Sequence, residues 1–142
     1  MFWDSSAIVP LVFPEPHSAE LERIAADREE PVIWWATPVE CQAAIYRRSR
    51  EEVLPAEVVA QALRKLDRIF VDADVVAATT NVRERARRLV AAHPLRAADG
   101  LQLAAALVAC QEQPVSERFV CLDSRLREAT RREGFTLLPA SV

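Results

Sequence analysis

The sequence predicts an α/β fold in which a central, mainly parallel sheet lies between layers of helices. Short apolar runs typical of buried strands alternate along the chain with longer segments that have helical periodicity. This alternation favours parallel strands, because parallel neighbours need a long connection between them, usually a helix. The 142 residues contain no internal repeat and no linker-like stretch, so a single domain over residues 1–142 is expected.

The first third of the chain predicts two strands separated by two short helices. Residues 1–3 are a short apolar strand candidate, and a pair of serines then offers a cap for a helix over residues 7–13. Pro10 falls near the first turn of this helix, where proline is tolerated. Residues 18–27 carry apolar side chains on one helical face, and residues 31–36 have the apolar composition of a buried strand.

The middle of the chain is expected to be mostly helical. A helix begins with Thr-Pro and covers residues 37–50, and a second covers residues 55–70 with apolar side chains at helical spacing. Residues 70–71 are a candidate for a short strand. An arginine-rich helix that starts at residue 75 or 80 is expected to end at residue 92, before His-Pro.

The last third of the chain predicts a buried helix followed by a strand, a helix and a strand. Residues 96–111 are apolar almost all round, which is typical of a helix inside a protein. Residues 118–122 form the next strand candidate. A helix over residues 124–133 is stopped by Gly134, and residues 135–138 form the final strand.

Composition excludes several classes of protein. Cys41, Cys110 and Cys121 are isolated in apolar runs, so buried thiols are expected rather than a zinc site or a disulfide framework. Two glycines are too few for a phosphate-cradling loop. The sequence opens without a signal-peptide pattern and has no run long enough to span a membrane, so a cytoplasmic protein with no membrane partner is expected.

Four acidic residues stand at the ends of predicted elements. Asp4 follows the first strand, and Asp123 follows the strand over residues 118–122. Glu40 and Asp99 each fall in the first turn of a helix. The carboxyl ends of parallel strands and the starts of the following helices share one edge of a sheet, so all four carboxylates are expected to converge there.

Clustered carboxylates repel one another and raise their own pKa values unless a cation lies among them. Mg²⁺ prefers hard oxygen ligands and keeps several waters, which suits a site beside a phosphate. A metal held in this way activates water and stabilises the charge on a phosphodiester under attack. The acidic set therefore indicates a metal-dependent phosphodiester hydrolase.

Each acid also has a purely structural interpretation as a helix-end residue. Asp4 and Asp123 can cap the helices that follow them, and Thr37 and Glu40 have the spacing of a capping box. Asp99 is harder to explain in this way, because it starts a helix that is expected to be buried. The joint placement of the four acids favours a functional site.

The acids lie in segments that resemble the motifs of PIN-domain proteins of the VapC toxin family. These segments are residues 2–9, 37–40, 95–106 and 119–126, and they place the motif acids at Asp4, Glu40, Asp99 and Asp123. The resemblance covers most of the chain, and the third and fourth motifs are the most specific. Two departures are Pro10 and Gly100, where the family usually has a longer polar residue and alanine; neither removes an acid.

This resemblance implies a PIN-like, Rossmann-like three-layer α/β/α fold with Mg²⁺ or Mn²⁺ bound by the four acids. It also implies an endoribonuclease that cleaves RNA with metal-activated water, leaving a 5′-phosphate and a 3′-hydroxyl. Expected partners are the RNA substrate, a second copy in a homodimer, and a cognate VapB-type antitoxin that blocks the acidic cleft.

RNA must enter an acidic cleft, so arginines are expected around it. Arg96 and Arg125 are the first candidates, followed by Arg47 and Arg48, although such residues are often only solvated. Ser6 has two possible roles: it holds a metal-bound water or a substrate phosphate, or it is a helix cap.

Three other functions are compatible with parts of the pattern. A phosphoacceptor signalling domain also has an acidic Mg²⁺ pocket but needs a lysine at a strand end, whereas Lys65, the sole lysine, lies within a predicted amphipathic helix. A catalytically silent PIN-fold binding module stays open. So does a nuclease that acts on single-stranded or flap DNA, because the chemistry is the same.

Overall fold

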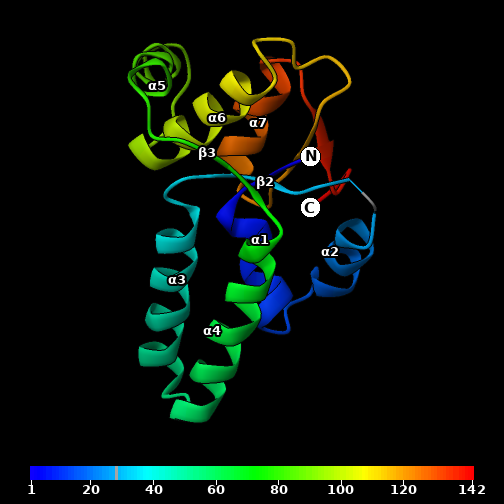
Figure 1. Ribbon diagram of the computed structural model, residues 1–142, viewed down its shortest axis with the longest axis vertical. Helices are drawn as coiled ribbons and strands as arrows, with labels where there is room; N and C mark the ends of the chain where they lie inside the picture. Colours follow the sequence, from blue (N-terminus) through cyan, green and yellow to red (C-terminus); the bar gives the residue numbers. More distant parts are fainter. Residues whose placement is uncertain (28) are drawn as a thin grey trace.

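The computed structural model describes residues 1–27 and 29–142, which form a five-stranded sheet between two layers of helices (Figure 1). The strands are β1 (Phe2–Trp3), β2 (Val32–Trp34), β3 (Asp74–Val76), β4 (Arg118–Val120) and β5 (Thr136–Leu138). The helices are α1 (Ser5–Val12), α2 (Ser18–Ala25), α3 (Thr37–Glu52), α4 (Ala56–Val71), α5 (Thr80–Ala92), α6 (Ala97–Ala109) and α7 (Ser124–Arg132).

All strand pairs in the sheet are parallel, which confirms the predicted fold class. The strand order is β3-β2-β1-β4-β5, so the chain builds outward from β1 to β3 and then returns to add β4 and β5 on the other side. The strand order therefore reverses between β1 and β4, and the backbone N–H of Asp4 donates to the carbonyl of Val120 at 3.0 Å across this junction. Open α/β sheets bind ligands at such a switch point, beyond the carboxyl ends of the strands.

Alternation along the strands divides the apolar interior into two cores, one on each face of the sheet. Phe2 and Phe119 face the layer of α5, α6 and α7. Their successors Trp3 and Val120 face the layer of α1, α3 and α4. Because side chains of a strand point alternately to opposite faces, two adjacent apolar residues serve both cores. Figure 1 shows α3 and α4 side by side below the sheet and α5 and α6 above it.

The third strand is the element that the sequence pattern misplaced. Residues 70–71, expected as a strand, belong to the end of α4, and β3 lies at Asp74–Val76 instead. The later start of α5, at Thr80, is correct, because the hydroxyl of Thr79 caps it by accepting from the N–H of Val82 at 3.3 Å. β3 is an edge strand of three residues, and neither of its faces is fully buried. Its sequence therefore lacks the alternation of apolar and polar residues that identifies many strands.

Helix α6 is buried between α5 and the sheet, as the all-round apolar sequence predicted. Gly100 allows the two helices to approach closely, since a Cβ atom there would lie 2.6 Å from Cγ1 of Val90. An alanine at this position would therefore force Val90 to shift. Despite the apolar character of α6, no helix in the described residues is long and apolar enough to cross a membrane.

Candidate acidic site

Asp4 is the buried centre of the site, with 4% of its surface exposed. It follows β1 and forms the N-cap of α1, where its Oδ2 accepts hydrogen bonds from the backbone N–H of Ser6 at 2.9 Å and from the Ser6 hydroxyl. The structural interpretation of Asp4 as a helix cap is therefore confirmed, and the interpretation of Ser6 as the cap is wrong.

The hydroxyl of Ser6 connects the ends of the two central strands. Besides donating to Asp4, it accepts hydrogen bonds from the backbone N–H groups of Leu122 at 2.9 Å and Asp123 at 3.3 Å. Ser6 thereby fixes the segment after β1 against the segment after β4. These contacts use the hydroxyl of Ser6 for hydrogen bonds inside the protein, and they fix the position of Asp4 relative to Asp123.

Asp123 and Asp99 also accept hydrogen bonds at helix N-termini. Oδ1 of Asp123, the N-cap of α7, accepts from the N–H groups of Arg125 and Leu126, both at 2.9 Å. Oδ2 of Asp99, in the first turn of α6, accepts from the N–H of Arg96 at 3.2 Å. Asp123 is exposed and Asp99 is partly buried. The helix dipole favours negative charge at both positions.

Glu40 is held differently from the other three acids, and the capping box expected with Thr37 does not form. The N-cap of α3 is Ala36, which offers no side-chain cap, and Thr37 is buried in the first turn. Oε2 of Glu40 instead accepts a hydrogen bond at 2.8 Å from Nε2 of Gln102 on α6. The hydroxyl of Thr37 also lies against Gln102, at 3.2 Å from Nε2.

These four acids line one cavity of about 500 Å³. Asp4 and Asp123 follow β1 and β4, and Glu40 and Asp99 lie in the first turns of α3 and α6. The four side chains therefore meet at the carboxyl edge of the sheet, as the sequence predicted. The other side chains around the cavity include Ser6, Glu15, Arg47 and Arg96.

The predicted arginines differ in how close they lie to the acids. Arg96 and Arg47 line the cavity and are exposed. Arg125 is not among the lining residues, although its charge lowers the pKa of Asp99. Arg48 points to other partners, because it forms ion pairs with Glu15 at 2.9 Å and with Glu52 at 3.0 Å.

The acids influence one another electrostatically. The pKa of Asp4 is raised to about 6, mainly by burial and also by the charges of Glu40 and Asp99, while the hydrogen bonds from Ser6 act in the opposite direction. Burial also raises the pKa of Asp99, and the charge of Asp123 adds to the increase. This is the pattern expected of like charges gathered in a partly desolvated cavity. A bound cation would relieve it.

The donor groups suit a hard cation, although they are not gathered into a finished coordination shell. Among residues 1–27 and 29–142, no three His, Cys, Asp or Glu side chains form a group that could hold a metal ion as they are placed. However, the hydrogen bonds that the described residues make to each carboxylate all fall on one of its oxygens: Oδ2 of Asp4, Oε2 of Glu40, Oδ2 of Asp99 and Oδ1 of Asp123. The second oxygen of each acid therefore stays available, and carboxylate oxygens are the ligands that Mg²⁺ prefers.

Two neighbours of the site were missed by the sequence pattern. Gln102 is 1% exposed, and its only signal was a polar residue in an otherwise apolar helix. Cys121 lies with Sγ 3.7 Å from Oδ2 of Asp4, and its sequence context indicated only a small buried residue. The expected burial of the cysteines is confirmed for Cys41 and Cys121, whereas Cys110 is partly exposed.

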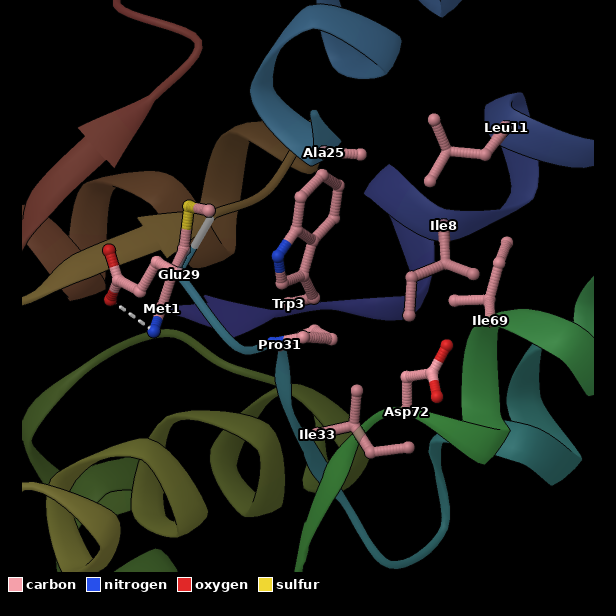
Figure 2. A pocket seen from close by; sticks show the side chains of 10 residues that line it. All are labelled: Met1, Trp3, Ile8, Leu11, Ala25, Glu29, Pro31, Ile33, Ile69 and Asp72. Carbon is pink, nitrogen blue, oxygen red and sulfur yellow. Dashed lines mark ion pairs between the residues drawn. The ribbon is translucent and has the colours of Figure 1, made fainter. Parts of the chain in front are cut away.

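A second cavity, of about 230 Å³, has a different character. Figure 2 shows it between the sheet and helices α1, α2 and α4, with Trp3, Ile8 and Ile33 among its apolar walls. The carboxylate of Glu29 at its edge is paired with the amino group of Met1. None of the four predicted acids lines this cavity, so the acidic cavity is the candidate site for metal-dependent chemistry.

The fold and the acidic cavity together define an α/β protein with a polar site at the switch point of a parallel sheet. The family model of the PIN domain matches residues 1–131, and the chain belongs to the PIN domain family. In fold it is similar to a solved structure described as a toxin–antitoxin complex from Klebsiella pneumoniae, with a TM-score of 0.65 and 11% sequence identity, covering 99% of this chain and 94% of the other. A comparison with curated proteins finds no match.

Proposed function

We propose that this protein is a divalent-metal-dependent endoribonuclease and the toxin of a VapBC-type toxin–antitoxin module. Membership of the PIN domain family, which consists largely of metal-dependent nucleases, supports the reaction class. The observation that carries the proposal is the meeting of four carboxylates from four separate segments in one cavity. Each of them keeps one oxygen without a hydrogen bond from the described residues, which suits a cation between them.

In this proposal Asp4, Glu40 and Asp99 hold Mg²⁺ or Mn²⁺, and Asp123 completes the set directly or through water. When bound, such a metal supplies an activated water and stabilises the negative charge of the phosphodiester. Asp4 contributes the most buried charge of the four, held in place by Ser6. Ser6 also holds the backbone before Asp123, so the chain itself sets the spacing of these two acids.

Arginines at the mouth of the cavity are proposed to bind the RNA backbone. Arg96 and Arg47 line the cavity, and neither forms an ion pair with any described residue. A guanidinium can contact a phosphate through two parallel hydrogen bonds. Arg125, beyond the lining, is proposed to extend this contact to a neighbouring phosphate. A local basic rim would thus attract RNA although the formal net charge is −3.

Proposed protein partners are a cognate VapB-type antitoxin and a second copy of the chain. The similarity in fold to a protein solved in a toxin–antitoxin complex supports the antitoxin. The exposed apolar side chains of Trp35 and Val39, at 60% and 68% exposure beside the start of α3, support a protein-binding surface near the acidic cavity.

Cleavage of RNA by the purified protein tests the proposed reaction. With Mg²⁺, structured RNA should be cut internally, leaving a 5′-phosphate and a 3′-hydroxyl. EDTA should stop the reaction, and excess Mg²⁺ or Mn²⁺ should restore it, because the carboxylates act through the cation. The products are resolved on denaturing gels, and matched single-stranded and flap DNA substrates run in parallel.

Three outcomes would overturn this proposal. Cleavage that persists in EDTA would contradict a metal-dependent reaction. Preferential cutting of DNA would replace the substrate class, and no cleavage of either nucleic acid with any divalent metal would favour a silent binding module. The toxin role is tested separately, since induced expression should arrest growth of a bacterial host and co-expression of the antitoxin should relieve the arrest.

A further inference from the structure

We propose that Gln102 is a positioning residue for Glu40 and sets the orientation in which that carboxylate meets a bound cation. The inference rests on the proposed metal-dependent function. Gln102 lies on α6, three residues after Asp99, and Glu40 lies on α3. Its amide therefore connects two of the four acid-bearing segments across the carboxyl edge of the sheet.

The hydrogen-bond geometry fixes the amide of Gln102. Nε2 donates to Oε2 of Glu40 at 2.8 Å and to the hydroxyl of Thr37 at 3.2 Å. A carboxylate can only accept, so the amide must present its nitrogen to Glu40, and both of its N–H groups are used. With 1% of its surface exposed, Gln102 has no alternative water-facing position.

Glu40 depends on this contact more than the other acids depend on any one side chain. Asp4, Asp99 and Asp123 each accept from a backbone N–H at a helix N-terminus, which holds their short side chains in place. Glu40 has a longer side chain, and within the described residues its carboxylate accepts only from Gln102. Gln102 thus does for Glu40 what the backbone does for the other three.

If Gln102 had only a structural role, it would stabilise the fold through its hydrogen bond with Thr37, and its contact with Glu40 would not matter for metal binding. Burying an amide among leucines and alanines is unfavourable unless its hydrogen bonds are satisfied, so an apolar residue would pack this helix position more simply. The hydroxyl of Thr37 lies 3.2 Å from Nε2 and 3.5 Å from Oε1 of Gln102, and both distances are longer than the 2.8 Å contact with Glu40. A Thr37→Val variant removes the Thr37 contact without touching Glu40 and therefore separates the two roles.

Calorimetric titration of the metal-free protein with Mn²⁺ tests the positioning role without relying on catalysis. We expect Gln102→Leu to weaken Mn²⁺ binding by ~10-fold or more, as is typical when a residue that orients a metal ligand is removed. Thr37→Val should bind Mn²⁺ nearly as the wild type does. In a Glu40→Ala background, Gln102→Leu should cause no additional loss, because its effect passes through the missing carboxylate.

Several outcomes would overturn the inference. A wild-type affinity in Gln102→Leu, an equal loss in Thr37→Val, or additive losses in the double variant would each assign Gln102 a structural role only. If the wild type binds Mn²⁺ and Gln102→Leu does so equally, the proposed function survives and the positioning role fails. If the wild type binds no Mn²⁺, both fail.

A second measurement uses the unmodified chain, in case Gln102→Leu does not fold. In NMR spectra, the side-chain NH₂ signals of Gln102 should shift during a Mg²⁺ titration with the same midpoint as the site itself. The hydrogen bond to Glu40 transmits the change in charge to this amide. Signals that stay unmoved while the site saturates would contradict the inference.

Discussion

Replacing Asp99 by asparagine should reduce RNA cleavage by at least ~100-fold, equivalent to ~2.7 kcal/mol or more on the activation barrier. The substitution removes a negative charge from the cavity while leaving an amide oxygen that can still accept from the N–H of Arg96. Loss of a favourable helix-dipole interaction and relief of repulsion from Asp123 act in opposite directions, so the free energy of unfolding should stay within ~1 kcal/mol of the wild type. Initial cleavage rates and urea denaturation measure the two effects.

Asp67→Asn is the matched control for this prediction. Asp67 is an exposed carboxylate on α4 and is not among the residues that line the acidic cavity. The same chemical change there should leave cleavage unaltered. An Asp99→Asn enzyme with nearly full activity would remove Asp99 from the proposed metal set, and a variant that is inactive because it unfolds would show it in the denaturation curve.

Replacing Asp4 by asparagine should make the metal-free protein more stable at neutral pH while abolishing cleavage. Burial raises the pKa of Asp4 from the ordinary value of 3.8 to about 6, so the ionised form is disfavoured in the folded state. This difference corresponds to up to ~3 kcal/mol of lost stability above pH 6. Asparagine carries no charge and can still accept from Ser6, so it should recover much of that loss.

The pH dependence gives this prediction a specific shape. A group whose pKa is higher in the folded state than in the unfolded state contributes stability at low pH, and that contribution disappears as pH rises through the folded pKa. The advantage of Asp4→Asn should therefore be largest above about pH 6 and shrink as the pH falls towards 4. Comparing the two proteins cancels the titration of the carboxylates that do not interact with Asp4, and the charges of Glu40 and Asp99 contribute to the remaining difference.

Addition of Mg²⁺ should reverse the order of stability. Metal binding to the native state stabilises the wild type by mass action, whereas the variant lacks a ligand and should respond little. Thermal denaturation in EDTA and in Mg²⁺, at several pH values, provides the measurement. Two results would show that the buried charge of Asp4 does not destabilise the folded protein. One is a stability difference that does not change with pH, and the other is a wild type that is the more stable protein in EDTA.

Much of the fold could be predicted because its signals are local. The buried strands and helix α6 follow from apolar runs, and the caps at Asp4 and Asp123 follow from residue type and position. The parallel sheet follows from alternation of the two kinds of segment. β3 escaped prediction because an exposed edge strand is specified by pairing with β2 and not by its own side chains.

The candidate site was predictable at the level of residues but not of contacts. The four acids could be brought together from sequence because each stands where a strand ends or a helix begins, and topology puts those points on one edge. The contact between Gln102 and Glu40 depends on how α3 and α6 pack across that edge. In the same way, only packing decides that Arg47 lines the cavity while Arg48 turns to Glu15.

Crystals of the protein soaked in Mn²⁺ would test the central claim most directly, through the anomalous scattering of the metal. A peak is expected in the acidic cavity, within coordination distance of carboxylate oxygens from Asp4, Glu40 and Asp99, with their side chains turned towards it. A cavity that stays empty at saturating Mn²⁺, or a metal bound elsewhere with these three carboxylates unmoved, would contradict it.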